Sequence, residues 1–201
     1  YNLRAIWNGN QQCIGAISNV VSITVTKIIS EISCLTSSSA VVIGNSIIIS
    51  GVISPACIGV QVTISYTSNE SWIILATVLS TSNGNFSYTW MPSHVETYHL
   101  KVSWEGDTIH EGAESNIALV MINKISTYLS CSVSLSKITE GNSVKVIGSI
   151  DPQISDKTII LTYRKPDGNT INRTVTTASD GSFGDSYKPE VTGSWYVIAS
   201  W

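Results

Sequence analysis

Apolar and polar residues alternate with a period of two along most of this chain, and no stretch shows the roughly 3.6-residue spacing of an amphipathic helix. Between residues 28 and 124, turn-forming residues interrupt the alternation roughly every 8 to 12 residues, as in a β-sandwich. The pattern predicts seven strands there, over residues 32–37, 46–53, 60–67, 72–80, 86–90, 98–104 and 116–122. Asn83-Gly84 lies between the fourth and fifth strands and supplies the positive φ angles of a tight hairpin turn. We therefore predict an all-β fold.

The pattern repeats with a period of 97 residues. The segment from Tyr1 to Trp7 returns as the segment from Tyr98 to Trp104, and again as residues 195–201. Single residues keep the same spacing: Gly44 and Gly141, Gly51 and Gly148, Pro55 and Pro152, and Cys34 and Cys131. Such a period matches one small domain rather than a solenoid repeat. We expect residues 1–27 to be the last two strands of one repeat, 28–124 a complete domain, and 125–201 a domain without its last strand.

Charged residues make up only 12% of the chain, and the net charge is −3. Ser, Thr and Asn are therefore expected to cover the surface, and no basic field is present that would attract nucleic acid. No apolar run approaches the length that spans a membrane. The cysteines and histidines show no metal-ligand spacing, and no nucleophile or phosphate-binding motif occurs. We expect no enzyme activity, no metal and no cofactor. Disulfides in an oxidising compartment suit the four cysteines better.

Acidic residues form no catalytic pair that the repeats share. Asp167 and Asp180 each precede a glycine and are ordinary turn residues. The segment from Glu105 to Asp107 is predicted to be a hairpin loop, and its counterpart at residues 8–10 carries amides in place of both acids.

Three asparagines fit the N-glycan acceptor pattern: Asn69, Asn85 and Asn172. Asn69 lies in a predicted turn, and the other two have the outward parity of their strands. A chain this rich in Asn, Ser and Thr also produces such sequences by chance. The outward positions favour their use as attachment sites for N-linked glycans, which would solubilise a surface poor in charge.

The repeats resemble the tandem immunoglobulin-like (Ig-like) domains of bacterial and archaeal cell-surface proteins. The resemblance rests on Gly51-Val-Ile-Ser-Pro55, Val62-Thr-Ile-Ser-Tyr66, Asn83-Gly-Asn-Phe-Ser-Tyr-Thr-Trp90 and Tyr98-His-Leu-Lys-Val-Ser-Trp-Glu-Gly-Asp107. It covers the whole chain and implies tandem seven-stranded sandwiches, although the paired cysteines of antibody domains are absent. Such modules serve as stalks, spacers, adhesins, filament subunits and enzyme appendages, so the resemblance specifies a fold rather than a function.

The expected Ig-like fold suggests two disulfides. It places the first strand at the same pole as the loop after the second strand, which predicts a bond between Cys34 and Cys57. In the next repeat the counterpart of Cys34 is Cys131, but Ile154 replaces the partner. We predict that Cys131 bonds to Cys13 of another chain.

The strand that residues 125–201 lack has a counterpart in the first residues of the chain. Residues 19–26 form a spare last strand, in which Asn19 is followed by the alternating Val21, Ile23 and Val25. Donated to a neighbouring chain, it would produce head-to-tail polymers. One observation opposes this, because Tyr1 to Trp7 repeats a strand that residues 195–201 already supply. Alternatively, the sequence is a window from a longer continuous array, and the missing strand follows Trp201. Both explanations stay open.

We predict an extracellular, cell-surface structural glycoprotein whose partners are other copies of itself. An apolar linker around Lys124, without Gly or Pro, would stiffen the array. The alternative is a non-catalytic accessory region of a secreted hydrolase or adhesin that binds carbohydrate, with Trp72 and Trp195 as the aromatic candidates.

Overall fold

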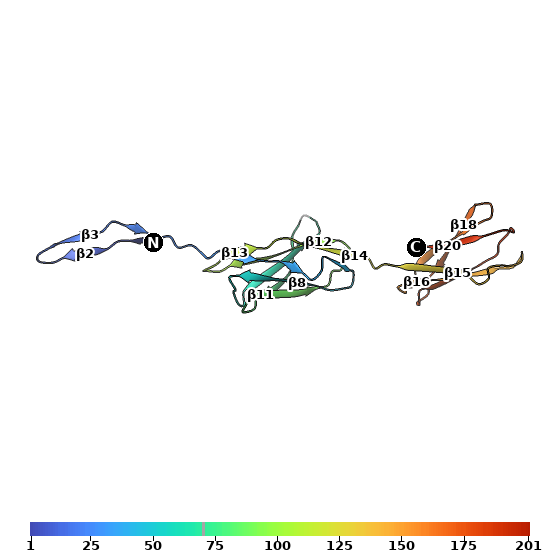
Figure 1. Ribbon diagram of the computed structural model, residues 1–201, viewed down its shortest axis with the longest axis horizontal. Helices are drawn as coiled ribbons and strands as arrows, with labels where there is room; N and C mark the ends of the chain where they lie inside the picture. Colours follow the sequence, from blue (N-terminus) through green and yellow to red (C-terminus); the bar gives the residue numbers. More distant parts are fainter. Residues whose placement is uncertain (70) are drawn as a thin grey trace. The chain divides into compact units, whose positions relative to one another are not determined.

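The computed structural model describes residues 1–69 and 71–201 and contains only strands, turns and irregular segments over this part of the chain. The prediction of an all-β chain is thus confirmed. Among the described residues, no helix has the length and apolar character needed to cross a membrane. The chain divides into two compact units, Tyr1–Lys124 and Ile125–Trp201 (Figure 1). The sandwich formed by residues 28–124 is called the middle domain below, and residues 125–201 are called the second unit.

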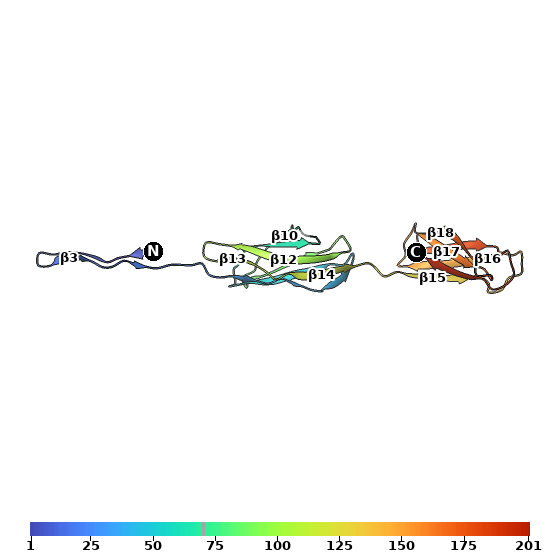
Figure 2. The same ribbon diagram turned by 90° about the horizontal axis from the view of Figure 1, so that it is seen from above.

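The middle domain consists of two facing sheets, which lie one above the other in Figure 1, and Figure 2 shows strands of the larger sheet spread out. The order of the larger sheet is β10 (Ile73–Leu79), β9 (Gln61–Thr67), β12 (Thr97–Gly106), β14 (Ala118–Asn123) and β7 (Ala40–Val42), with β13 (Glu111–Glu114) also paired to β12. The smaller sheet contains β11 (Asn85–Trp90), β8 (Ile47–Ser54), β5 (Glu31–Ile32) and β6 (Leu35–Thr36). Most strand pairs are antiparallel, but β14 and β7 run parallel.

Two of these strands differ from the sequence prediction. The first predicted strand, residues 32–37, is split into β5 and β6, and after a short break the chain crosses to the other sheet as β7. The serines at 37–39 mark this crossing rather than the end of pairing. The short β13 was not predicted, because its sequence Glu-Gly-Ala-Glu has no apolar alternation. Its backbone pairing with β12 holds it in place.

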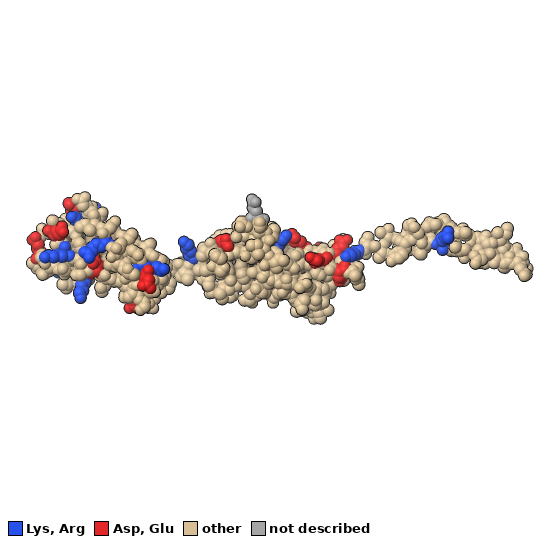
Figure 3. Space-filling model, turned by 180° about the vertical axis from the view of Figure 1, so that it is seen from behind, with Lys and Arg blue, Asp and Glu red and all other residues tan. Residues whose placement is uncertain are grey.

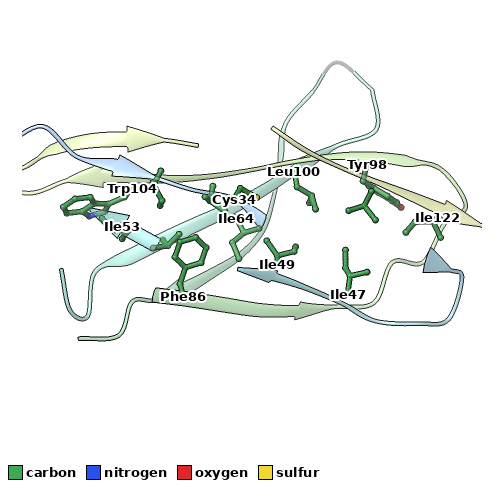
Figure 4. Close-up of a cluster of buried hydrophobic side chains, with 14 residues drawn as sticks. Cys34, Ile47, Ile49, Ile53, Ile64, Phe86, Tyr98, Leu100, Trp104 and Ile122 are labelled. Carbon is green, nitrogen blue, oxygen red and sulfur yellow. The ribbon is translucent and has the colours of Figure 1, made fainter. Parts of the chain in front are cut away.

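The core lies between the two sheets, where alternate side chains of each sheet meet (Figure 4). Ile47 and Ile49 of β8 and Leu100 of β12 are completely buried. At one end of this core three aromatic rings pack together, with centroid separations of 5.7 Å for Tyr66–Trp90, 5.5 Å for Tyr66–Tyr98 and 4.8 Å for Trp90–Tyr98. The predicted hairpin turn is present, with Gly84 at φ 74°.

Residues 1–22 form a separate two-stranded pairing within the first unit. Strand β1 (Asn2–Leu3) pairs with β4 (Val21–Ser22), and β2 (Ile6–Gly9) pairs with β3 (Ile14–Ile17). We call this segment the N-terminal hairpin. It follows the plan of β12 and the strands after it, as the 97-residue period predicts.

The second unit has two three-stranded sheets. One has the order β15 (Tyr128–Val133), β16 (Val144–Asp151), β19 (Ser182–Tyr187), and the other β18 (Thr170–Thr176), β17 (Thr158–Arg164), β20 (Tyr196–Ser200). Their core contains Val146, Ile159, Leu161, Tyr163, Phe183 and Tyr187.

A candidate strand-acceptor groove in the second unit

Every strand of the second unit has a counterpart in the middle domain, but β7, β13 and β14 of the middle domain have no counterpart among the described residues of the second unit. The period places β16, β17, β18, β19 and β20 at the positions of β8, β9, β10, β11 and β12. Among the described residues of the second unit, no strand corresponds to β14 or to β7. In the middle domain these two strands lie side by side and close one edge of the larger sheet.

A hollow of about 590 Å³ lies at the position of the missing strands. Its walls include counterparts of the core residues Ile47, Ile49, Tyr66, Trp90, Tyr98 and Leu100, namely Val144, Val146, Tyr163, Tyr187, Trp195 and Val197. In the middle domain the same region of the core contains Val120 and Ile122 of β14, which are 0% and 2% exposed. The hollow of the second unit thus has the place that β14 fills in the middle domain.

One edge of the groove is a sheet edge with free backbone groups. In the middle domain β12 pairs with β9 on one side, and on the other with β14 from Thr97↔Met121 to Leu100↔Ala118. Its counterpart β20 pairs with β17, and no second strand pairs with it among the described residues. Val197 is consequently only half-buried, whereas its counterpart Leu100 is completely buried. An open edge beside an apolar groove favours pairing with an additional strand.

A polar network links the two sheets next to the groove. The Tyr163 hydroxyl donates a 2.9 Å hydrogen bond to Asp185, and the Arg173 guanidinium lies 2.8 Å from the same carboxylate. Burial raises the pKa of the Tyr163 hydroxyl well above its ordinary value, and the Asp185 carboxylate raises it further. At neutral pH this tyrosine is therefore a neutral donor that satisfies a nearly buried carboxylate.

The N-terminal hairpin and the residues just after it expose apolar side chains whose counterparts in the middle domain are buried. Ile23 and Val25 are 47% and 73% exposed, although their counterparts Val120 and Ile122 are core residues. Tyr1 is 83% exposed, against 3% for its counterpart Tyr98. An isolated two-stranded hairpin is marginally stable in water at best, because it has no second layer against which to bury an apolar face.

The four cysteines occupy different environments, and all four carry free thiols in the structure. Cys34 is buried, which raises the pKa of its thiol to about 11, and Cys57 packs against the same core cluster. Cys13 lies in the exposed turn between β2 and β3, and Cys131 lies exposed on β15. The Cys34–Cys57 and Cys131–Cys13 disulfides remain predictions.

The three predicted glycan acceptors, Asn69, Asn85 and Asn172, are exposed. Asn85 lies in β11 and Asn172 in β18, where its side-chain oxygen accepts a hydrogen bond from Thr162. Glycosylation remains a prediction. Charged side chains occupy little of the face shown in Figure 3.

Of the two aromatic candidates for sugar binding, Trp72 is 39% exposed and has the Lys101 ammonium 4.5 Å from its ring centroid. Trp195 is half-buried and donates its indole N–H to Val191. The sequence pattern did not predict a second hollow of about 580 Å³ in the middle domain, which is lined by Tyr66, Trp90, His94 and Glu96 among others. Trp90 packs against the core and also borders this hollow.

The acidic turn residues serve local structure. Asp107 accepts hydrogen bonds from the backbone of Ile109 and His110 and contacts the His110 ring at 3.0 Å, which lowers the pKa of the Asp107 carboxyl to about 2. Asp167 and Asp180 likewise accept backbone hydrogen bonds in their turns. Within the described residues, no group of three potential metal ligands comes together.

Comparisons with known proteins bear on the fold. No protein-family model matches the chain, and no curated protein matches it. Among solved structures, the chain is similar to a crystal structure of a tetra-tandem repeat in the extending region of a large adhesion protein, with 16% sequence identity and a TM-score of 0.39. The match covers 86% of this chain and 48% of that one, so the chain spans about half the length of that repeat region.

Proposed function

We propose that this chain is a structural repeat region of an extracellular cell-surface filament or stalk, built from tandem Ig-like sandwiches. The arrangement of the middle domain supports the Ig-like assignment. Its first strand is divided between the two sheets, and its second part, β7, runs parallel to the last strand, β14. The proposed parts are residues 1–27 as the end of one repeat, 28–124 as a whole domain, and 125–201 as a further domain in which the groove takes the place of β14.

The groove of the second unit is proposed to receive residues 19–26 of another copy. The observation that carries this proposal is the match between the groove and a segment of the same chain. The groove occupies the position of β14, and Ile23 and Val25, which follow the hairpin, repeat the buried side chains of β14 but are exposed. Lys27 follows this segment as Lys124 follows β14, so donation would reproduce the connection between repeats.

Donation requires an exchange of strand partners, in which β20 of the acceptor replaces β1 of the donor. In the hairpin, Val21 pairs with Leu3. After the exchange Val21 would pair with Val197, because their counterparts Ala118 and Leu100 pair in the middle domain. Little is lost, because Leu3 and Val21 are each more than half exposed. Full burial of Ile23 and Val25 would contribute about 1–2 kcal/mol each, in addition to the pairing of the open β20 edge.

The remaining proposals follow from a role outside the cell. The array is non-catalytic, and the Cys34–Cys57 and Cys131–Cys13 disulfides would lock the domain and the junction between copies. N-linked glycans on Asn69, Asn85 and Asn172 would cover a surface that has few charges.

Sedimentation velocity of residues 1–201 over a concentration series, with electron microscopy of the same samples, tests the assembly. We expect linear oligomers that grow with concentration, and monomers when Ile23→Asp and Val25→Asp are combined. The matched control is Ile14→Asp, because Ile14 is 94% exposed and its counterpart in the middle domain is Glu111. A wild-type chain that stays monomeric, or a double variant that assembles as well as the control, would overturn the assembly proposal.

A sugar-binding accessory role is the second candidate, favoured by the hollow beside Tyr66, Trp90 and Glu96. Half-buried aromatic rings next to a carboxylate could bind the apolar face of a sugar ring and its hydroxyls. Titration of the intrinsic tryptophan fluorescence with cell-wall oligosaccharides tests it. Saturable quenching would support this role, and its absence across the panel would exclude it for those sugars.

A further inference from the structure

A side-chain amide connects the two sheets of the middle domain at the start of the last strand. The backbone N–H of Cys34 donates to Oδ1 of Asn116 at 3.3 Å, and Nδ2 of Asn116 donates to the carbonyl oxygen of Cys34 at 3.2 Å. The two residues are 82 positions apart. Asn116 thus behaves as an additional peptide group that pairs with the strand segment between β5 and β6.

In the N-terminal hairpin, Ser18 and Asn19 repeat the local hydrogen bonds of Ser115 and Asn116, but the Asn19 amide has no backbone partner like Cys34 among the described residues. Ser115 accepts from Val102 N–H at 3.0 Å and donates to the Asn116 carbonyl at 2.7 Å. Ser18 accepts from Ala5 N–H at 2.9 Å and donates to the Asn19 carbonyl at 2.8 Å. Over the described part of the chain, the Asn19 amide makes no hydrogen bond of its own, and Asn19 is exposed.

The second unit presents the matching backbone at Cys131, the counterpart of Cys34. The backbone N–H of Ser134 donates to the carbonyl oxygen of Lys145 in β16 at 2.8 Å. Because N–H and C=O groups alternate in direction along an antiparallel strand, the backbone of Cys131 points away from β16, toward the edge where the missing strand would lie.

We propose that Asn19 of one copy clamps the backbone of Cys131 of the next copy and thereby sets the register of the donated strand. This inference rests on the strand-donation assembly proposed above. Apolar alternation cannot set the register alone, because a slip of two residues keeps the same face buried and merely puts Val21 in the place of Ile23. Only one register brings the Asn19 amide to Cys131, so this side chain selects that register of the donated strand over the two-residue slip.

Cross-linking of variants of residues 1–201 measures the register. The combination of Tyr196→Cys and Ser22→Cys reports the expected register, because the counterparts of these residues, His99 and Leu119, pair in the middle domain. Tyr196→Cys with Val20→Cys reports the two-residue slip that puts Val21 in the place of Ile23. With Asn19 present, we expect the first pair to form the interchain disulfide and the second to fail. With Asn19→Ala, both pairs should form, and association should weaken about 5- to 50-fold, as expected for the loss of one or two hydrogen bonds.

The matched control is Gln11→Ala, which removes an amide from the exposed turn of the same hairpin and should change neither measurement. Alkylation of Cys131 in the reduced protein gives a second readout, because its counterpart Cys34 is 1% exposed in the closed domain. Cys131 should therefore become protected on assembly and lose part of this protection in Asn19→Ala. An Asn19→Ala protein with wild-type association and a single register would overturn the clamp but leave strand donation intact. If Ile23→Asp with Val25→Asp does not prevent assembly, strand donation itself fails.

Discussion

The middle domain and the second unit share a strand plan and many of their core positions, yet only the first is closed. Leu100 and Val197 have the same place in that plan, but Leu100 is completely buried and Val197 is half-buried. Trp104 and Trp201 differ more, at 5% and 57% exposed, because β13 and its turn cover Trp104. The comparison separates two contributions. Six strands suffice to build an inner core around Val146 and Leu161, whereas the last strand seals the edge.

The two domains also fill one part of the interior differently. Where the second unit has the Arg173–Asp185 ion pair beside Tyr163, the middle domain has Ala76 and Tyr88 beside Tyr66. The repeat thus preserves one tyrosine and replaces its polar partners with an aromatic residue. The Arg173 side chain is 46% exposed, so the ion pair is only partly buried and is not expected to stabilise the fold more than apolar packing of similar volume.

The largest expected effect comes from matched truncations of β12 and β20. Leu100→Ala should destabilise the middle domain by about 2–5 kcal/mol, because it leaves a cavity in a sealed core. Val197→Ala should cost the second unit of the monomer only about 1 kcal/mol or less, since this side chain already contacts solvent. Domain-resolved hydrogen exchange would give both free energies of unfolding. Equal costs at the two sites would show that the groove is closed in solution.

The strand plan and the place of this groove could be predicted from sequence, because both depend on local alternation and on the 97-residue period. The Asn116–Cys34 clamp could not, because a side-chain amide that pairs with a backbone 82 residues away leaves no periodic signal. β7 was missed for a related reason, since its pairing with β14 is a tertiary contact and its three residues carry no alternation.

The next effect tests the polar network of the second unit. Asp185→Ala should destabilise this unit by about 1–3 kcal/mol, because the Tyr163 hydroxyl and the Arg173 guanidinium lose their acceptor. Combining Arg173→Ala with Asp185→Tyr, the pair found in the middle domain, should recover most of that loss. Urea unfolding followed by domain-resolved exchange measures both. If the combined variant were as unstable as Asp185→Ala, the two interiors would not be interchangeable.

A smaller effect, confined to high pH, distinguishes the domains at Tyr98 and Trp195, which have the same place in the repeat. Burial, with a contribution from Glu96, raises the pKa of the Tyr98 hydroxyl above its ordinary value of 10.0. The folded state therefore holds this proton more tightly than the unfolded state. The resulting stability is complete below pH 10 and declines as the pH rises beyond it. Tyr98→Trp should make the middle domain less sensitive to alkali, as measured by unfolding at pH 8 and pH 11. Unchanged sensitivity would contradict this assignment.

The smallest effect concerns the turn after β12 and its copy in the N-terminal hairpin. Asn10 accepts hydrogen bonds from the backbone of Gln12 and Cys13 at 2.9 and 2.8 Å, and Asp107 does the same for Ile109 and His110 at 2.7 and 2.6 Å. An amide can therefore hold this turn, and Asp107→Asn should leave the stability at pH 7 nearly unchanged. The acid dependence should differ. The pKa of the Asp107 carboxyl is lowered from 3.8 to about 2, so its contribution is present above pH 4 and is lost as the pH falls toward 2. Asp107→Asn should remove that dependence, and carboxyl-carbon NMR of the wild-type protein should show a midpoint near 2. A midpoint at 3.8 would mean that the His110 contact and the turn hydrogen bonds do not persist in solution.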